Sequence, residues 1–157
     1  MMRYSIVESP VGDLLVHGDD EALCGLWFSG RPRAGWTRDD AAFAAVATQL
    51  DEYFAGDRRA FDLPLRAEGT PFEQAVWQKL REIPYGETTS YGELALSLGL
   101  TGHGARAVGR ANGRNPIAVI VPCHRVIGAD GSLTGFGGGL ERKRRLLDLE
   151  SAAVPLF

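Results

Sequence analysis

The sequence has little of what several classes of protein require. Its 157 residues include only two cysteines, Cys24 and Cys123, too few and too far apart for a disulfide framework. No C-x-x-C or H-x-x-x-H spacing supports a zinc site, so we expect no metal and no cofactor. No apolar run is long enough for a signal peptide or a membrane span. We therefore expect a cytoplasmic protein with no membrane partner.

Acidic residues are absent from one long stretch of the chain. The net charge of −3 divides into −5 over residues 1–70, with 7 Lys and Arg against 12 Asp and Glu, and +2 over residues 71–157, with 10 against 8. Between Glu93 and Asp130 there is no acidic residue, but four arginines lie there: Arg106, Arg110, Arg114 and Arg125. Such a stretch fits a cationic face directed at phosphates, or a chance cluster on a solvated surface.

The first half of the chain predicts a small sheet and one helix. Short apolar runs separated by Pro and Gly turn signals predict successive antiparallel strands, near residues 3–7, 13–17 and 22–28. Apolar residues at helical spacing predict a core helix from Asp39 to Tyr53, with acidic residues in its first turn and Gly56 at its end. Residues 61–65 fit an edge strand. The chain has 157 residues, of which 45% are hydrophobic, and this length and composition are sufficient to bury a core.

The second half predicts helices, and a boundary near residues 66–70 gives two domains, 1–69 and 70–157. Thr70-Pro71-Phe72-Glu73 has the pattern of a capping box with proline at the first helical position. Ser90-Tyr91-Gly92-Glu93 repeats that pattern before a short helix, and residues 105–112 predict another. Two short helices with a glycine-containing link are typical of a helix-turn-helix.

The second of these short helices has an unusual composition for one that reads bases. Its sequence, "GARAVGRAN", offers Ala105, Ala107 and Gly109 in place of the side chains that read base edges. Small residues permit close approach to nucleic acid, and Arg106 is long enough to enter a groove or the space of a displaced base. Equally, small residues allow two helices to pack closely.

The stretch "VIVPCHRVIG" places Cys123 between a proline and His124. The apolar run before Cys123 predicts a buried strand or extended segment. The thiol then either has only a structural role in the core or is held rigidly in one place for a reaction. A free thiol is mostly protonated at neutral pH, so a nucleophilic Cys123 needs a base. Contact with His124 requires a turn after Pro122 or a bridging water. Glu150, near the end of a helix expected over Leu140–Glu150, is a third member that could orient the imidazole.

Four motifs in order resemble a known family. They are "SYGELA", "ARAVGRAN", "PCHRV" preceded by "NP", and "LTGFGGGLERKRRLL". Together they resemble the O(6)-alkylguanine-DNA alkyltransferases, also called methylated-DNA–protein-cysteine methyltransferases, over residues 70–150. The strand-rich first half resembles that family's N-terminal lobe. The resemblance implies an α/β (α+β) fold, with a small antiparallel sheet and a helix in a ribonuclease H-like lobe and a helical, winged helix-turn-helix-like second lobe.

The resemblance also implies a reaction, in which Cys123 accepts the alkyl group of a flipped O(6)-alkylguanine irreversibly, so that each molecule acts once. The implied partner is double-stranded DNA containing alkylated guanine, bound by a protein that is a monomer in solution. Cooperative assembly on DNA, the range of alkyl groups, activity on O(4)-alkylthymine and a metal in the N-terminal lobe stay open. His124 is implied to act as the base through a water, with Glu150 orienting it, and the Tyr91 hydroxyl to donate to the guanine ring.

Further residues take roles from the same resemblance. Arg106 is the finger that fills the base stack, and Asn115 braces the reading helix against the active-site segment. The other implied DNA contacts are Tyr91, Ala105, Ala107, Gly109 and Arg110. Main-chain groups of Cys123, Val126 and Gly137 are implied to grip the guanine edge. The implied substrate pocket is formed by Ala118, Val126, Phe136 and Gly137.

Three features fall outside the family pattern or leave alternatives. Phe136 stands where the family usually has a tyrosine, and Cys24 matches no acceptor and is interpreted as a core thiol. The run Arg142–Arg145 is interpreted as a solvated helix face in preference to a second DNA site. A non-catalytic helix-turn-helix protein that recognises damaged guanine is one other function, but its cysteine would have no use. A cysteine hydrolase is another, but it gives no reason for the small-residue helix.

Overall fold

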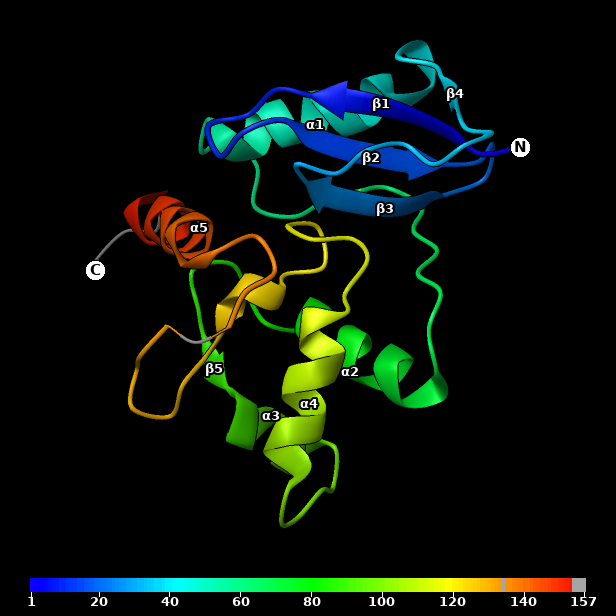
Figure 1. Ribbon diagram of the computed structural model, residues 1–157. Coiled ribbons are helices and arrows are strands. Elements are labelled where there is room, and N and C mark those ends of the chain that lie inside the picture. Colours follow the sequence, from blue (N-terminus) through cyan, green and yellow to red (C-terminus); the bar gives the residue numbers. More distant parts are fainter. Residues whose placement is uncertain (134, 154–157) are drawn as a thin grey trace. The chain divides into compact units, whose positions relative to one another are not determined.

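A computed structural model describes residues 1–133 and 135–153 (Figure 1). Its contacts divide the chain into two compact units, Met1–Glu68 and Gly69–Phe157. No helix in the described part of the chain is long and apolar enough to cross a membrane.

The first unit contains a four-stranded sheet with the order β3-β2-β1-β4. The strands are β1 (Arg3–Val7), β2 (Leu14–Gly18), β3 (Leu23–Phe28) and β4 (Thr37–Arg38). The first three are antiparallel neighbours, as the apolar runs and turn signals predict. The two-residue β4 pairs parallel with β1 and is not predicted, because two residues are too short to show a period.

The predicted core helix is present, but it begins differently. A 3₁₀ turn (Ala41–Phe43) leads into α1 (Ala44–Phe54), which lies behind the sheet in the view of Figure 1 and buries Val46, Leu50 and Tyr53. The expected acidic first turn is wrong, because the Asp40 carboxylate precedes the helix and accepts a hydrogen bond from Ser5. Gly56 adopts φ +82° directly after the helix, a conformation that suits glycine. Over residues 61–65 the described backbone forms only one bridge, from Leu65 to Leu23, and no edge strand.

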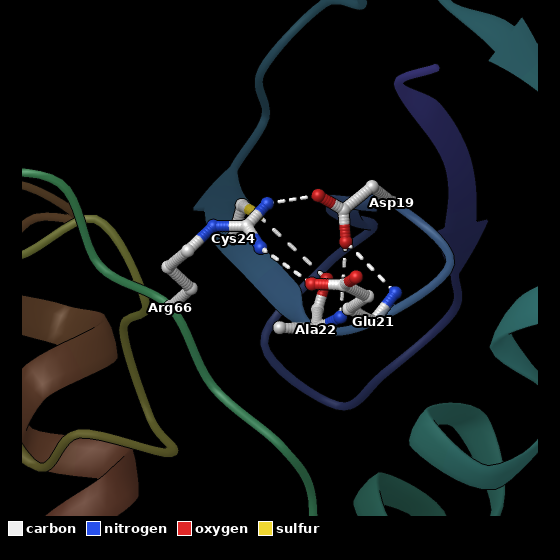
Figure 2. Close-up of polar contacts among 5 residues, drawn as sticks. All are labelled: Asp19, Glu21, Ala22, Cys24 and Arg66. Atoms are coloured by element: carbon white, nitrogen blue, oxygen red, sulfur yellow. Dashed lines mark hydrogen bonds and ion pairs between the residues drawn. The ribbon is translucent and has the colours of Figure 1, made fainter.

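Cys24 lies half-buried on β3, so its interpretation as a core thiol is wrong. The Arg66 guanidinium contacts this thiol and two carboxylates (Figure 2): it bonds to Asp19, and its nitrogens lie 3.4 Å from Cys24 Sγ and 3.8 Å from the Glu21 carboxylate. The amide of Leu23 donates to Pro64 O at 2.8 Å, and the amide of Arg66 donates to Leu23 O at 2.9 Å. These two bonds hold residues 64–66 beside β3. Arg66 therefore fixes the chain after the core helix to the sheet.

The second unit consists mainly of helices. Its elements are α2 (Pro71–Arg81), β5 (Thr89–Ser90), α3 (Tyr91–Ser97), α4 (Gly104–Gly113), the 3₁₀ turn η2 (Cys123–Arg125), β6 (Val126–Ile127) and α5 (Leu140–Ala153). α3 packs against α4, and β5 pairs with β6 to form a small wing. This is the winged helix-turn-helix-like arrangement that the motifs predict.

The two predicted capping boxes have different outcomes. At α2 both reciprocal bonds are present, with Thr70 Oγ1 accepting from Glu73 N at 3.1 Å and the Glu73 carboxylate accepting from Thr70 N at 2.9 Å. At α3, Ser90 accepts from Glu93 N at 3.0 Å, but the Glu93 carboxylate accepts from the Thr89 hydroxyl instead of closing the box. The second helix start thus has half of the predicted cap.

Candidate active site and nucleic-acid interface

The apolar run before the cysteine forms a turn and not the predicted strand or extended segment. The amide of Ile120 donates to Ala118 O at 2.8 Å, that of Val121 donates to Ile117 O at 2.9 Å, and Val119 has φ +71°. A β-branched residue in the left-handed region is strained, so surrounding contacts must hold it. Residues 117–121 are all buried, which supplies those contacts.

Asn115 closes this turn with its side chain. Its Nδ2 donates to Val121 O at 2.8 Å, and its Oδ1 accepts from Ile117 N at 3.0 Å. The amide side chain thus satisfies main-chain groups that a neighbouring strand would otherwise satisfy. The direct bond from α4 to the active-site segment is made by Asn112, whose Nδ2 donates to Cys123 O at 3.3 Å. The side-chain bonds of Asn115 lie within the turn, and Asn112, for which no role was predicted, joins α4 to Cys123.

Cys123 opens the 3₁₀ turn that follows Pro122, the turn that contact with His124 requires. Its side chain is buried, with 6% of the residue exposed. Burial raises the pKa of the Cys123 thiol, while a hydrogen bond from Asn115 and the positive charge of Lys143 act in the opposite direction. The thiol is therefore protonated at neutral pH and needs a base before it can act as a nucleophile.

His124, the residue after Cys123, forms a buried pair with Glu150. The His124 Nε2 atom lies 2.7 Å from Glu150 Oε2, and both side chains are at most 1% exposed. Burial acts to raise the pKa of Glu150, but hydrogen bonds from His124 and Arg125 outweigh it and lower the pKa to about 2. Glu150 is thus a carboxylate that can only accept, so Nε2 carries the hydrogen of a neutral ring.

The other ring nitrogen of His124 then carries the lone pair. Nδ1 is buried, and no described residue makes a hydrogen bond to it. Burial also lowers the pKa of His124, although Glu150 acts to raise it, so the ring stays neutral at physiological pH. A neutral imidazole with an available Nδ1 and an ionised carboxylate on Nε2 is the arrangement of a general base.

Arg125 is a buried part of this cluster, so both alternatives offered for the arginine stretch, a cationic face and a solvated surface, are wrong at this residue. Its Nε and Nη2 donate to the two oxygens of Glu150 at 2.8 and 3.0 Å, and its Nη1 donates to Ile83 O at 2.7 Å. The guanidinium also lies 5.7 Å from the centre of the Tyr85 ring. The bidentate bond fixes the carboxylate that orients His124.

Lys143 is fully buried, so the interpretation of residues 142–145 as a solvated face is wrong at this position. Its Nζ donates to Val126 O at 2.6 Å and lies 5.9 Å from the centre of the Tyr91 ring. Burial lowers the pKa of Lys143, whereas a Cys123 thiolate would raise it. The sequence holds a signal for this position, because Lys143, Leu146 and Glu150 follow helical spacing on the one buried face of α5.

The predicted DNA-contact residues gather on α3 and α4. Arg106 and Arg110 are exposed on α4, while Ala105, Ala107 and Gly109 are half-buried. A Cβ atom at Gly109 would lie 3.8 Å from the Tyr91 ring, so the smallest residue stands where that ring approaches α4. The helix therefore presents long cationic side chains on a background of small ones.

The predicted pocket residues lie on three segments. Ala118 and Val126 are buried, and Val126 opens β6. Phe136 is half-buried and Gly137 exposed in the loop before α5, where Gly139 N donates to Phe136 O at 2.9 Å. Within residues 1–133 and 135–153, no group of three or more His, Cys, Asp and Glu side chains could hold a metal ion.

The second unit combines two features. One is a helix-turn-helix that presents arginines on a helix of small residues, and the other is a buried thiol followed by a histidine–carboxylate pair. Together they define a nucleic-acid-binding protein with a nucleophilic cysteine. Sequence models of two domains match the chain: "6-O-methylguanine DNA methyltransferase, DNA binding domain" over residues 71–152 and "6-O-methylguanine DNA methyltransferase, ribonuclease-like domain" over residues 2–67. The chain belongs to the 6-O-methylguanine DNA methyltransferase family, which confirms the resemblance drawn from the four motifs.

Relatives and solved structures are similar over the whole chain. A methylated-DNA–protein-cysteine methyltransferase of Mycobacterium tuberculosis is 51% identical over 159 residues, covering 99% of this chain and 96% of the relative. One from Methanosarcina acetivorans is 49% identical over 156 residues, covering 96% and 99%. The crystal structure of M. tuberculosis OGT in complex with DNA has a TM-score of 0.92 and 52% identity, covering 98% of this chain and 96% of that chain. The predicted fold class is thereby confirmed.

Proposed function

We propose that this protein repairs DNA by direct reversal, moving the alkyl group from O(6) of a guanine in duplex DNA to Sγ of Cys123. The observation that carries the proposal is the buried thiol that precedes a neutral His124 bound to an ionised Glu150. Relatives at about half identity, named for methyl transfer to a protein cysteine, support it. A protein of this kind is consumed by its reaction, because the cysteine thiolate is too poor a leaving group for water to displace it from the alkyl carbon of the thioether.

The chemistry follows from the cluster around the thiol. The Cys123 proton passes through a water molecule to His124 Nδ1, and Glu150 stabilises the imidazolium that forms. The thiolate attacks the alkyl carbon, so that the S–C bond forms as the C–O(6) bond breaks. The guanine departs with the electron pair and regains a proton, and the Tyr91 hydroxyl donates to the ring as its charge grows. Arg125 keeps Glu150 ionised throughout.

Access to the thiol requires the base to leave the duplex. A buried sulfur cannot reach O(6) of a stacked guanine, so the nucleotide is extruded at a cost of a few kcal/mol. The small residues of α4 let the helix enter the minor groove, and Arg106 fills the stack. Main-chain groups of Cys123, Val126 and Gly137 hold the guanine edge, while Ala118 and Phe136 form apolar walls of the pocket.

We also propose that the protein acts as a monomer in the cytoplasm. All proposed catalytic residues lie between Tyr91 and Glu150 of one chain, so one copy can carry out the transfer. The cytoplasmic location is supported by the two cysteines, both of which are free thiols.

Intact-protein mass spectrometry on a titration with a duplex containing O(6)-methylguanine tests the function. We expect one added methyl per chain, on Cys123, and a repaired fraction that stops at one lesion per protein molecule. Cys24→Ser is the matched control and should still gain the methyl group, whereas Cys123→Ser should not. Repeated turnovers would instead indicate a hydrolase, and binding with no mass change would indicate a non-catalytic recognition protein.

A further inference from the structure

Three arginines follow one side of α4 at intervals of four residues: Arg106, Arg110 and Arg114. Residues four apart lie on neighbouring turns, about 6 Å along the helix axis. Arg106 and Arg110 are exposed, and the side chain of Arg114, at the C-cap, is 72% exposed. The sequence has no acidic residue between Glu93 and Asp130, so no side chain of α4 itself neutralises this row.

A groove of about 140 Å³ lies beside the row, between α4 and the start of α2. Ala107 and Ala111 of α4 contribute to it, together with Phe72 of α2, which is 36% exposed. Arg110 and Arg114 also line the groove. Small side chains along its α4 side allow another backbone to approach, and the two guanidinium groups give it a positive charge.

Among the described residues that line this groove, Glu73 is the only acidic one. Its Oε1 closes the capping box with Thr70 N, while its Oε2 lies 3.5 Å from Arg114 Nη1. That distance is long for a charge-assisted hydrogen bond, and the exposed arginine is well solvated, so the pair is weak. Arg114 can therefore leave Glu73 for a stronger anionic partner at little cost.

We propose that Arg110 and Arg114 bind backbone phosphates of duplex DNA along this groove, and that Glu73 occupies Arg114 in the free protein in place of a phosphate. The inference rests on the proposed function, which supplies duplex DNA as the partner. Phosphates follow one strand at about 3.4 Å along the duplex axis, so two arginines about 6 Å apart reach two phosphates. A phosphate offers Arg114 a bidentate, charge-assisted contact, and DNA must break the Glu73–Arg114 ion pair before Arg114 can make it.

The proposal predicts opposite effects for the two partners in the binding of an undamaged duplex, followed by fluorescence anisotropy between about 50 and 200 mM salt. Arg114→Ala should weaken binding and reduce the slope of log K against log salt by about 0.9, the value for one lost phosphate contact. E73Q should tighten binding by about threefold, the order of an exposed ion pair. Glutamine can still close the capping box, so α2 should remain intact.

A double-mutant cycle separates this mechanism from a general charge effect. The gain from E73Q should disappear in the Arg114→Ala background, because the carboxylate then has no arginine to occupy. Glu141 and Arg145 of α5, an exposed pair 3.3 Å apart, provide matched controls. E141Q and R145A change the net charge in the same way and should leave both the slope and the affinity unchanged.

Three results would overturn the inference: an unchanged salt slope in Arg114→Ala, a gain from E73Q that persists without Arg114, or equal effects from the α5 pair. Thermal unfolding of each variant shows that the fold is retained. Reaction of the unmodified protein with free O(6)-benzylguanine, read by the mass of Cys123, is measured alongside. If Cys123 gains no benzyl group, the proposed function fails. If Cys123 gains the benzyl group but the double-mutant cycle shows no coupling between Glu73 and Arg114, only the arginine–phosphate inference fails.

Discussion

Cys123 is bound to its surroundings mainly through its main chain, because its carbonyl accepts from Asn112 and its amide donates to Val121 O at 2.8 Å. Cys123→Ala keeps both contacts and nearly the same shape. We expect this variant to lose all alkyl transfer yet bind DNA within about tenfold of the unmodified protein, or about 1.4 kcal/mol. Binding assays and intact mass on the same preparation measure the two quantities. A collapse of DNA affinity would show that the thiol has a structural role.

Phe136 is the residue at which the chain departs from the usual family pattern. If the aromatic ring mainly forms an apolar wall, phenylalanine already supplies it, since ring burial provides most of an aromatic contribution. Phe136→Tyr should then change the single-turnover transfer rate by less than about tenfold. Phe136→Ala should slow transfer much more, by opening the pocket to water. A gain of about a hundredfold on introducing tyrosine would instead show that a hydroxyl assists proton movement.

At the scale of elements, a variant of α4 can distinguish the extrusion of the base from the alkyl-transfer reaction itself. Arg106 is exposed on this helix, and only a duplex substrate needs a side chain to replace the flipped base. Arg106→Ala should therefore slow repair of duplex DNA far more than reaction with free O(6)-benzylguanine. Arg144→Ala, an exposed arginine of α5, is the control and should affect neither. Equal losses on both substrates would indicate that Arg106 supports the fold.

The elements that the sequence predicts well are those with a local chemical signal. Thr70 and Glu73 define the start of α2 because both bonds of a capping box lie within four residues. The turn at residues 117–121 has no such signal, since a continuous apolar run is equally compatible with a strand. What decides its shape is Asn115, which satisfies main-chain groups of the turn itself. That choice depends on side-chain geometry that composition does not contain.

The same distinction applies to the candidate site. Spacing alone left the Cys123–His124–Glu150 relay open, and the family resemblance made it a specific prediction. Arg125 and Lys143 escaped prediction because a charged residue in a sequence is assumed to face solvent, whereas both are buried against main-chain oxygens. Buried cations become apparent only when the acceptors that satisfy them have known positions.

At the scale of the whole molecule, the buried His124–Glu150 pair links stability to pH. The pKa of Glu150 is about 2 in the folded protein against an ordinary value of 4.5, so the unfolded chain binds its proton more readily. The stability that this carboxylate contributes is complete above about pH 4.5 and is lost as pH falls toward 2. The pKa of His124 is also lowered from 6.5, so protonation of the unfolded chain begins to cost stability below that pH.

We therefore expect the free energy of unfolding to fall continuously from about pH 6.5 to pH 3, measured by urea titration at each pH. Glu150→Gln should remove the part of this fall that lies below pH 4.5, so the free energy of unfolding should depend less on pH in that range. The same variant should lose about 3–5 kcal/mol at pH 7, because Arg125 is left buried without its charge partner. A Glu150→Gln curve parallel to that of the unmodified protein would show that other carboxylates control the acid transition.

The burial of Cys123 also determines how long an unused molecule remains fit for use. Oxidants attack thiolates that solvent can reach, and this sulfur is both covered and, because burial raises its pKa, protonated. Oxidation past the reversible sulfenic acid, to sulfinic or sulfonic acid, would permanently remove the only acceptor of a protein that reacts once. The environment that makes the thiol need a base at the moment of transfer is thus also what preserves it while the molecule waits for a lesion.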